Sequence, residues 1–395
     1  MVTSGAQSYK VAGLFSGIGG LELGLSAAGH TTSLLCEIWD SARAVLSTRF
    51  PDVALADDVC TLRELPDDVE LVTAGFPCTD LSQAGRTAGI EGEQSGMVVH
   101  VFRLLDQHHP RWLVLENVRN MLPLDSGRAM RYLVSELERR KYNWAYRVVD
   151  SRFVGVPQRR QRVLLVASQI DDPRTVVLSD EAGEAGPDNY ADDAFGFYWT
   201  EGLRGLGWAR DATPTLKGGS TIGIPSPPGI WIPGAPLGRQ LVTPSIEDAE
   251  ELQGFARGWT SSASDARGRK GPRWKLVGNA VTVGVAEWLG RRLACPGSYD
   301  DSDAVRMLDE DRWPSAAWGT AEGRFGSQLS MWPEQRPYRH LRDVLRQEGL
   351  MPLTYRAAAG FLERTQRAKL RFDPDFILDV KRHVEAVAPV FQNGG

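Results

Sequence analysis

The first 165 residues alternate short apolar runs with amphipathic segments. Apolar runs typical of buried strands cover residues 9–15, 32–36, 71–74, 112–115 and 162–167. Between the early runs, apolar positions at helical spacing predict helices over 21–29 and 41–50. Strands that alternate with helices predict a mostly parallel α/β sheet, in which ligands bind beyond the carboxyl ends of the strands.

The pattern changes near Ile170. Residues 176–202 contain seven acidic residues and no basic residue, and residues 203–238 are dense in glycine and proline. This composition predicts a small, loop-rich insert over 171–238. Helical periodicity returns at 245–255, where Ser245 and Asp248 have the spacing of a capping box, and again from Asn279 to Leu293. Further helices are expected around 338–350 and 354–368.

These shifts predict three parts: a catalytic domain formed by 9–170 and 239–295, the insert 171–238, and a mainly helical C-terminal extension, 296–395. Two interpretations of the extension remain open. It is either a stabilising cap or a module that binds a partner or extra DNA. As a cap, it would dock on the catalytic domain through aromatic side chains, namely Trp313, Trp318, Trp332, Tyr338 and Phe361.

The composition is that of an ordinary soluble protein, with 42% hydrophobic and 24% charged residues among 395. No run approaches the roughly 18 apolar residues of a membrane span, and the polar N-terminus has no secretory signal. The four cysteines form no Cys-x-x-Cys pair, which disfavours a disulfide scaffold or a zinc site. We therefore expect a reduced, cytoplasmic protein without a metal.

Local charge is more informative than the net charge of −5. Residues 111–162 contain twelve basic and five acidic residues, and residues 257–275 contain six and one. Either segment alone is typical of a solvated face. Because the two segments flank the insert, together they predict a cleft for a polyanion.

A glycine-rich segment, Phe15-Ser16-Gly17-Ile18-Gly19-Gly20, lies between the first strand and the first helix. Glycines there let the backbone approach a ligand closely. Glu22 stands where a dinucleotide fingerprint has its third glycine, so a nicotinamide cofactor is disfavoured. Glu37 ends the second strand, and Asp58 lies where a third strand would end. These features predict a nucleoside-bearing cofactor, and the alternative is a tight structural turn with two surface acids.

Three further motifs place reactive groups near strand ends. Cys78 follows a strand behind Pro77, and a thiolate there would be a nucleophile, although a lone cysteine is often inert. Glu116 emerges from an apolar strand, which suits a proton donor, whereas the ordinary alternative is a helix cap by Asn117. In residues 157–162, Arg160 and Arg162 would point to one face of an extended chain and suit phosphates or a catalytic thiolate and carboxylate.

Taken in order, these motifs resemble those of bacterial DNA (cytosine-5-)-methyltransferases. Each motif is weak alone, but the ordered set is specific and covers about residues 10–293. The set is Phe15–Gly20, Glu37, Asp58-Val59, Gly75-Phe-Pro-Cys78, Glu116-Asn-Val118, Gln158–Arg162, Leu252-Gln-Gly-Phe255 and Gly278-Asn-Ala-Val281.

The resemblance implies a Rossmann-like domain dependent on S-adenosylmethionine, with 171–238 as the target-recognition insert. Cys78 would add to carbon 6 of a cytosine flipped out of the duplex, and Glu116 would hold the ring while carbon 5 accepts the methyl group. Arg160 and Arg162 would support the covalent step. The alternatives are the same chemistry on RNA, or a catalytically silent DNA-binding accessory protein.

The resemblance also implies binding residues. Those expected at the cofactor are Phe15, Ser16, Gly17, Ile18, Gly19, Gly20, Glu37, Ile38, Asp58, Val59, Pro77, Asn279 and Val281. Those expected at the substrate are Ser82, Asn117, Gln158, Arg204, Arg210 and Lys217. The chain departs from the family pattern at Thr79-Asp80, at Ile38 and in the long stretch from Arg239 to Leu252. As partners we expect double-stranded DNA and a cognate restriction endonuclease or defence component, with the chain acting as a monomer near the nucleoid.

Overall fold

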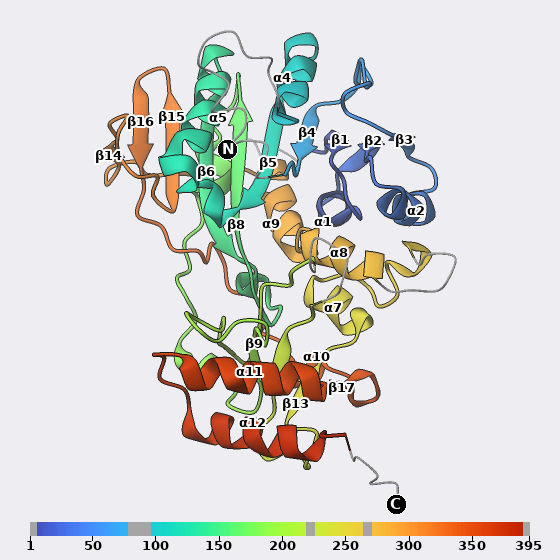
Figure 1. Cartoon of the computed structure of the whole chain (residues 1–395). Helices are drawn as coiled ribbons and strands as arrows, with labels where there is room; N and C mark the ends of the chain where they lie inside the picture. Colours follow the sequence, from blue (N-terminus) through green and yellow to red (C-terminus); the bar gives the residue numbers. More distant parts are fainter. Residues whose placement is uncertain (1–5, 78–95, 219–225, 264–270, 390–395) are drawn as a thin grey trace, which may run out of the picture. The chain divides into compact units, whose positions relative to one another are not determined.

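A computed structural model describes residues 6–77, 96–218, 226–263 and 271–389 (Figure 1). The chain forms two compact units. Unit 1 contains Met1–Val154, Gln161–Glu184 and Ala280–Arg336, and unit 2 contains Gly155–Arg160, Ala185–Asn279 and Pro337–Gly395. The stretch 239–279, assigned above to the catalytic domain, thus clusters with most of the insert. The C-terminal extension is divided between the two units.

Unit 1 is built on a mixed sheet that, in the described residues, contains ten strands. One half is parallel, with the order β3 (Ala54–Ala56), β2 (Thr31–Cys36), β1 (Lys10–Leu14), β4 (Leu71–Ala74) and β5 (Trp112–Val118). The other half is antiparallel and continues with β8 (Gln161–Ser168), β6 (Asn143–Asp150), β15 (Ala316–Thr320), β16 (Gly323–Gly326) and β14 (Val305–Arg306).

The expectation of a mostly parallel sheet is therefore correct only for its first half. All five strands expected from the apolar runs are present. However, β6 and β8 are joined by a short connection, which favours antiparallel pairing because a parallel crossover needs a longer segment. The strands β14–β16 come from the C-terminal extension, so part of that extension belongs to the central sheet.

Apolar side chains cover both faces of this sheet. Along β1, Val11 belongs to one core cluster while Ala12 and Leu14 belong to another, as the alternation of side chains in a strand requires. The first cluster includes residues of α1 (Gly20–Ala27), α6 (Arg174–Val177) and α9 (Val283–Ala294), and the second includes residues of α4 (Val98–Gln107) and α5 (Arg128–Arg139). The predicted second helix is α2 (Asp40–Arg49), and short 3-10 helices are η1 (Arg119–Met121), η2 (Leu124–Gly127) and η3 (Ser151–Val154).

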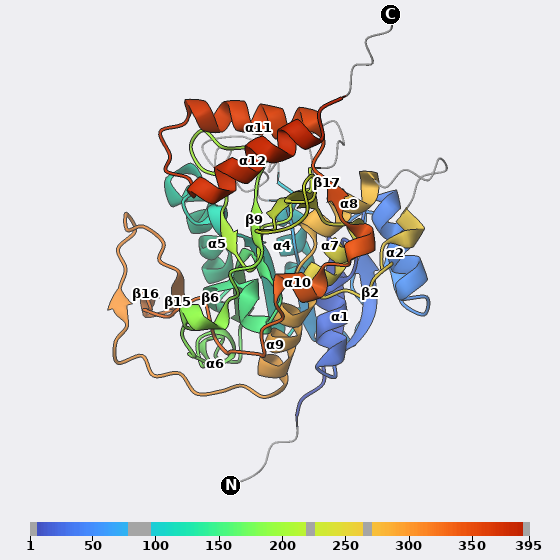
Figure 2. The same cartoon turned by 90° about the horizontal axis from the view of Figure 1, so that it is seen from below.

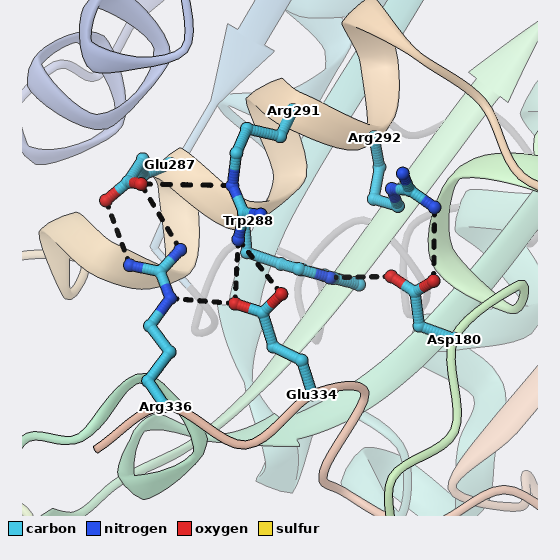
Figure 3. Close-up of polar contacts among 7 residues, drawn as sticks. All are labelled: Asp180, Glu287, Trp288, Arg291, Arg292, Glu334 and Arg336. Atoms are coloured by element: carbon cyan, nitrogen blue, oxygen red, sulfur yellow. Dashed lines mark hydrogen bonds and ion pairs between the residues drawn. The ribbon is translucent and has the colours of Figure 1, made fainter. Parts of the chain in front are cut away.

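The end of the unit 1 part of the extension is fastened to α9 by ion pairs (Figure 3). Glu334 accepts hydrogen bonds from Arg291 and Arg336, each at 2.7 Å. Arg336 also reaches Glu287 at 3.0 Å, which closes an alternating network of charges. The chain up to residue 336 is thereby anchored on the helix that follows Val281.

Unit 2 has much shorter strands than unit 1, in keeping with the glycine- and proline-rich composition of the insert. Its main sheet has the order β10 (Ala209–Arg210), β9 (Phe195–Phe197), β12 (Gly229–Trp231), β13 (Leu241–Thr243) and β17 (Met351–Pro352), and β7 (Gln158–Arg159) pairs with β11 (Thr213–Pro214). Its helices are α7 (Ile246–Leu252), α8 (Gly271–Asn279), α10 (Leu341–Val344), α11 (Tyr355–Arg367) and α12 (Pro374–Ala386), with short 3-10 helices η4 (Pro187–Asn189), η5 (Ser261–Ala263) and η6 (Gln347–Gly349). Figure 2 shows α11 and α12 side by side.

The helix predictions in unit 2 had mixed outcomes. The capping box of Ser245 and Asp248 is confirmed at the start of α7, and α11 closely matches the predicted 354–368. The predicted helix over 338–350 is wrong, because only the single turn α10 and the 3-10 turn η6 form there. The backbone amides of Arg339 and Leu341 donate to other parts of unit 2 and do not begin a longer helix. No helix within the described residues is long and apolar enough to span a membrane.

Candidate functional site

The glycine-rich segment forms a tight loop between β1 and α1. Phe15, Gly17 and Gly19 all have positive φ angles, of 57°, 56° and 81°. A methyl group added at Gly17 would meet no atom within 4 Å, so the loop is open there, whereas one at Gly19 would collide with Phe50. Of the remaining loop residues, Ile18 is buried, Gly20 begins α1, and the Ser16 hydroxyl donates to the Gly13 carbonyl. The loop therefore offers backbone to a ligand at Gly17.

A carboxylate is held beside this opening. The Glu37 oxygens accept from the amides of Gly17 and Trp39, both at 2.8 Å. Burial raises the pKa of Glu37, and these backbone hydrogen bonds partly oppose that shift. The adjacent Ile38 side chain is 64% exposed. An open backbone, a fixed carboxylate and an exposed apolar side chain fit a nucleoside with ribose hydroxyls and a flat base.

Two other expected cofactor segments are also placed. Asp58 follows β3 as predicted and accepts from the Cys60 amide at 2.8 Å, while Val59 is buried. Val281 packs in a small apolar cluster with Leu21 of α1 and Ala286 of α9. The two helices approach so closely that a methyl group on Gly24 would lie 2.5 Å from Ala286. In unit 1, Val281 therefore packs against the helix that follows the glycine loop, although Leu21 and Val281 are 260 positions apart in the sequence.

The candidate catalytic pair lies on neighbouring antiparallel strands. Glu116 on β5 and Arg162 on β8 are 7% and 8% exposed. The Nε of Arg162 lies 2.8 Å from Oε1 of Glu116. The other carboxylate oxygen, Oε2, lies 3.5 Å from the position that a Cβ atom added to Gly75 would occupy. The basic motif was predicted to suit phosphates or a catalytic thiolate and carboxylate, and Arg162 contacts the carboxylate; the thiolate contact stays a prediction.

The strand end before the predicted nucleophile is held by Asn117. Its Nδ2 donates to the Phe76 carbonyl at 3.0 Å, and its Oδ1 accepts from the Val118 amide. Asn117 is therefore not the simple helix cap of the alternative interpretation, because it connects β5 to the chain leaving β4. Pro77 is exposed there. Cys78 and Ser82 lie outside the described residues.

Gln158 and Arg160, near the start of the basic motif, make their contacts within unit 2. Gln158 is completely buried, and its amide donates to Leu252 at 3.0 Å and to Gln253 at 3.1 Å. Arg160 is also completely buried and donates to the carbonyls of Leu216 and Gly278. In this geometry the two side chains hold backbone segments together, and contact with a substrate stays a prediction for both.

The predicted DNA contacts of the insert differ in their surroundings. Arg210 pairs with Asp192 at 2.6 Å, and Lys217 pairs with Glu201 at 2.6 Å. Arg204 is exposed at the tip of a turn. Of the residues expected at the cofactor, Asn279 is exposed and ends α8 in unit 2. Arg239, which begins the long stretch that departs from the family pattern, donates to the Leu350 carbonyl at 3.2 Å.

The sequence did not predict a buried ion pair at Glu250, two residues before the Leu-Gln-Gly-Phe motif. Glu250 is completely buried and accepts from Arg273 at 2.9 Å and from the Thr260 amide at 2.8 Å. The only sequence signal was the acidic helix before the motif and the basic segment after it. Among the described residues, no three or more His, Cys, Asp or Glu side chains are grouped so that they could hold a metal ion.

Comparisons with known proteins agree with this geometry. A model of the family described as C-5 cytosine-specific DNA methylase matches residues 9–190. The chain is 45% identical over 386 residues to Type II methyltransferase M2.BsuMI of Bacillus subtilis (strain 168), covering 94% of this chain and 97% of that protein. It is 28% identical to Type II methyltransferase M.NaeI of Lentzea aerocolonigenes, covering 78% and 80%. The first match extends well beyond residues 10–293.

Solved structures support the fold. The S. pombe Dnmt2 methyltransferase matches with a TM-score of 0.53 and 17% identity, covering 72% of this chain and 98% of that one. A putative DNA modification methyltransferase encoded within a prophage (E. coli) matches with a TM-score of 0.51 and 18% identity, covering 72% and 98%. At these identities the likeness establishes only that the Rossmann-like architecture is shared.

Proposed function

The chain belongs to the C-5 cytosine-specific DNA methylase family, and from this premise we propose that it modifies one cytosine within a specific duplex sequence through a covalent Cys78 adduct. It is a DNA cytosine-5 methyltransferase that uses S-adenosylmethionine. The observation that carries the finer proposal is the buried contact of Arg162 with Glu116 at the end of β5. It places a carboxyl group and a positive charge one strand away from the chain that leads to Cys78.

The open loop fits the cofactor. Phe15, Gly17 and the rest of the glycine segment would line it, Glu37 would accept from its ribose hydroxyls, and Ile38 would cover one face of its adenine. Asp58 and Val59 would meet the adenine edge, and Val281 supports the loop through α1. When bound, the cofactor supplies an electrophilic methyl group for carbon 5.

The side chains of unit 1 supply the rest of the chemistry. The target cytosine must leave the duplex, because its ring carbons cannot be attacked inside the stack. The Glu116 carboxyl group then holds the ring nitrogen 3 and the amino group. The Arg162 guanidinium stabilises negative charge that develops on the ring. Asn117 positions the attacking loop through the Phe76 carbonyl.

The bond changes balance around Cys78. Its thiolate forms a bond to carbon 6, and the displaced electron pair makes carbon 5 nucleophilic. Carbon 5 takes the methyl group from the cofactor's sulfonium, whose sulfur would keep the electron pair of the broken bond, and carbon 5 then loses its hydrogen as a proton to water. The electron pair left behind re-forms the ring double bond, the carbon–sulfur bond breaks, and the Cys78 thiolate is restored.

The relatives support a proposal for the biological setting. M2.BsuMI and M.NaeI are Type II methyltransferases, and 45% identity over nearly the whole chain supports the same setting here. We place the chain in restriction–modification or phage defence, acting as a monomer beside a cognate endonuclease. Arg204, Arg210 and Lys217 of the insert would then contact the DNA.

Base-resolution sequencing for methylated cytosine tests the proposal. DNA from cells expressing the wild-type chain should carry methylated cytosine in one recurring sequence, and Cys78→Ala should abolish it. Cys60→Ala removes an exposed cysteine of the same unit and is the matched control. Methylation that survives in Cys78→Ala contradicts the covalent mechanism. Methylation found only on RNA contradicts the DNA substrate.

A further inference from the structure

The end of the C-terminal extension and the insert share one core in unit 2. Strand β17 pairs with β13, so the extension adds an edge to the insert's sheet. Phe197 of β9 packs against Phe361 of α11 and Phe376 of α12, with ring centroids 5.1 and 5.2 Å apart. All three side chains are at most 1% exposed. The helices labelled α11 and α12 in Figure 1 thus complete the hydrophobic core of the insert.

One arginine of α11 holds a particular turn of the insert, formed by residues 201–205. The Arg364 guanidinium donates to the Trp199 carbonyl at 2.6 Å and to the Glu201 carbonyl at 2.9 Å. A methyl group on Gly202 would lie 3.3 Å from the Phe361 ring, so the turn rests directly on the helix. The guanidinium spans the carbonyl groups of Trp199, which precedes the turn, and of Glu201, its first residue, and this fixes the direction of the turn.

The turn exposes an apolar side chain next to a basic one. Its base is closed by hydrogen bonds from the Tyr198 amide to Leu206 at 2.7 Å and from Gly202 to Gly205 at 2.8 Å. At its tip, Leu203 is 47% exposed and Arg204 is exposed as well. An arginine reads guanine in the major groove, and an apolar side chain contacts the thymine methyl group.

We infer that Leu203 and Arg204 read base edges and that Arg364 of the extension is the positioning residue that fixes them for this reading. The inference rests on the proposed function, because it needs a duplex substrate. A turn that is already ordered loses little conformational entropy when DNA binds, and a wrong base pair then costs the full contact. The extension would thus determine specificity, whereas the resemblance confined that role to the insert.

The experiment compares Arg364→Gln with Arg356→Gln, an exposed arginine on the same helix. Methylation rates are measured on the duplex identified by sequencing and on duplexes with one base pair changed. Arg364→Gln should lower the ratio of these rates by about tenfold at one or two positions. Arg356→Gln should leave the ratio at the wild-type value. Affinity for S-adenosylmethionine and the melting temperature are measured on the same samples.

Two further variants keep the inference testable if Arg364→Gln folds poorly. Arg204→Gln should lower discrimination at one base pair without changing the melting temperature. Arg364→Lys, which keeps the positive charge, should retain part of the wild-type discrimination. Unchanged discrimination in Arg204→Gln and Arg364→Lys, with an active wild-type chain, overturns the inference alone. A wild-type chain that methylates no DNA overturns the proposed function and the inference with it.

Discussion

The two units position their side chains in different ways. In unit 1, Glu116 and Arg162 lie on long paired strands, and the register of β5 with β8 brings them together. In unit 2 the strands have two or three residues, and side chains such as Gln158 and Arg364 hold the backbone directly. The long strands of unit 1 are paired through their backbones, and this pairing does not depend on any single side chain. The loops of unit 2 do depend on single side chains such as these.

The buried acidic residues show the same contrast. In unit 2, Asp211, Asp248 and Glu250 are all completely buried. Asp211 accepts from the Leu341 amide, Asp248 pairs with Arg257, and Glu250 pairs with Arg273. Because a buried charge without a partner is costly, loss of any one of these contacts should destabilise unit 2. We therefore expect substitutions in the site of unit 1 to remove activity and substitutions of these buried acids in unit 2 to remove stability.

The largest expected effect is on the rate in unit 1. Glu116→Gln keeps the size of the side chain but replaces its carboxyl group, so single-turnover methylation should slow by about 10²–10⁴-fold. The circular dichroism spectrum should remain that of the wild type, because strand pairing places this residue. Glu138→Gln, which changes another carboxylate of unit 1 paired with an arginine, should retain the wild-type rate. A Glu116→Gln rate within tenfold of the wild type would contradict the proposed role.

The next effect is on the stability of unit 2. Glu250→Ala removes the more deeply buried of the two carboxylates that pair with Arg273 and an acceptor for the Thr260 amide, so unfolding should become easier by about 3–5 kcal/mol. Glu363→Ala breaks an ion pair in which both side chains are 70% exposed and should cost about 1 kcal/mol or less. Urea titration followed by tryptophan fluorescence measures both. Equal costs for the two variants would mean that the buried ion pair contributes no more to the stability of unit 2 than an exposed one does.

The same contrast explains how much was predictable from sequence. The glycine loop, Glu37, Asp58 and Glu116 were predicted from the sequence because each lies within or just after a strand, near its carboxyl end, and such a position is a local signal. The pairing of β15 with β6 was missed because it spans about 170 residues, whereas the short connection between β6 and β8 is a local signal for their antiparallel pairing. Contacts such as those of Gln158 or Arg364 depend on which backbone carbonyl lies within reach, and no local pattern records this.

One residue of unit 1 breaks the rule for buried acids. Glu22, in the first turn of α1, is 1% exposed, and in the described part of the chain neither carboxyl oxygen has a hydrogen-bond partner. Burial raises its pKa from 4.5 to about 7, and the charge of Glu37 adds to the shift. The backbone and the hydroxyls of Thr73 and Ser16 act in the opposite direction but are weaker than burial.

The smallest expected effect is a dependence of stability on pH that Glu22 confers. Because the folded state holds this proton more tightly than the unfolded state, the stabilisation is complete below pH 4.5 and is lost as the pH rises to about 7. Relative to Glu22→Gln, which cannot ionise, the wild type should lose up to about 3 kcal/mol over that range. Urea titrations of both chains from pH 5 to 8 measure the difference, and Glu64→Gln, at an exposed position, is the control. If the Glu22→Gln difference is as flat as that of the control, Glu22 has a partner or water within reach, and unit 1 follows the same rule for buried acids as unit 2.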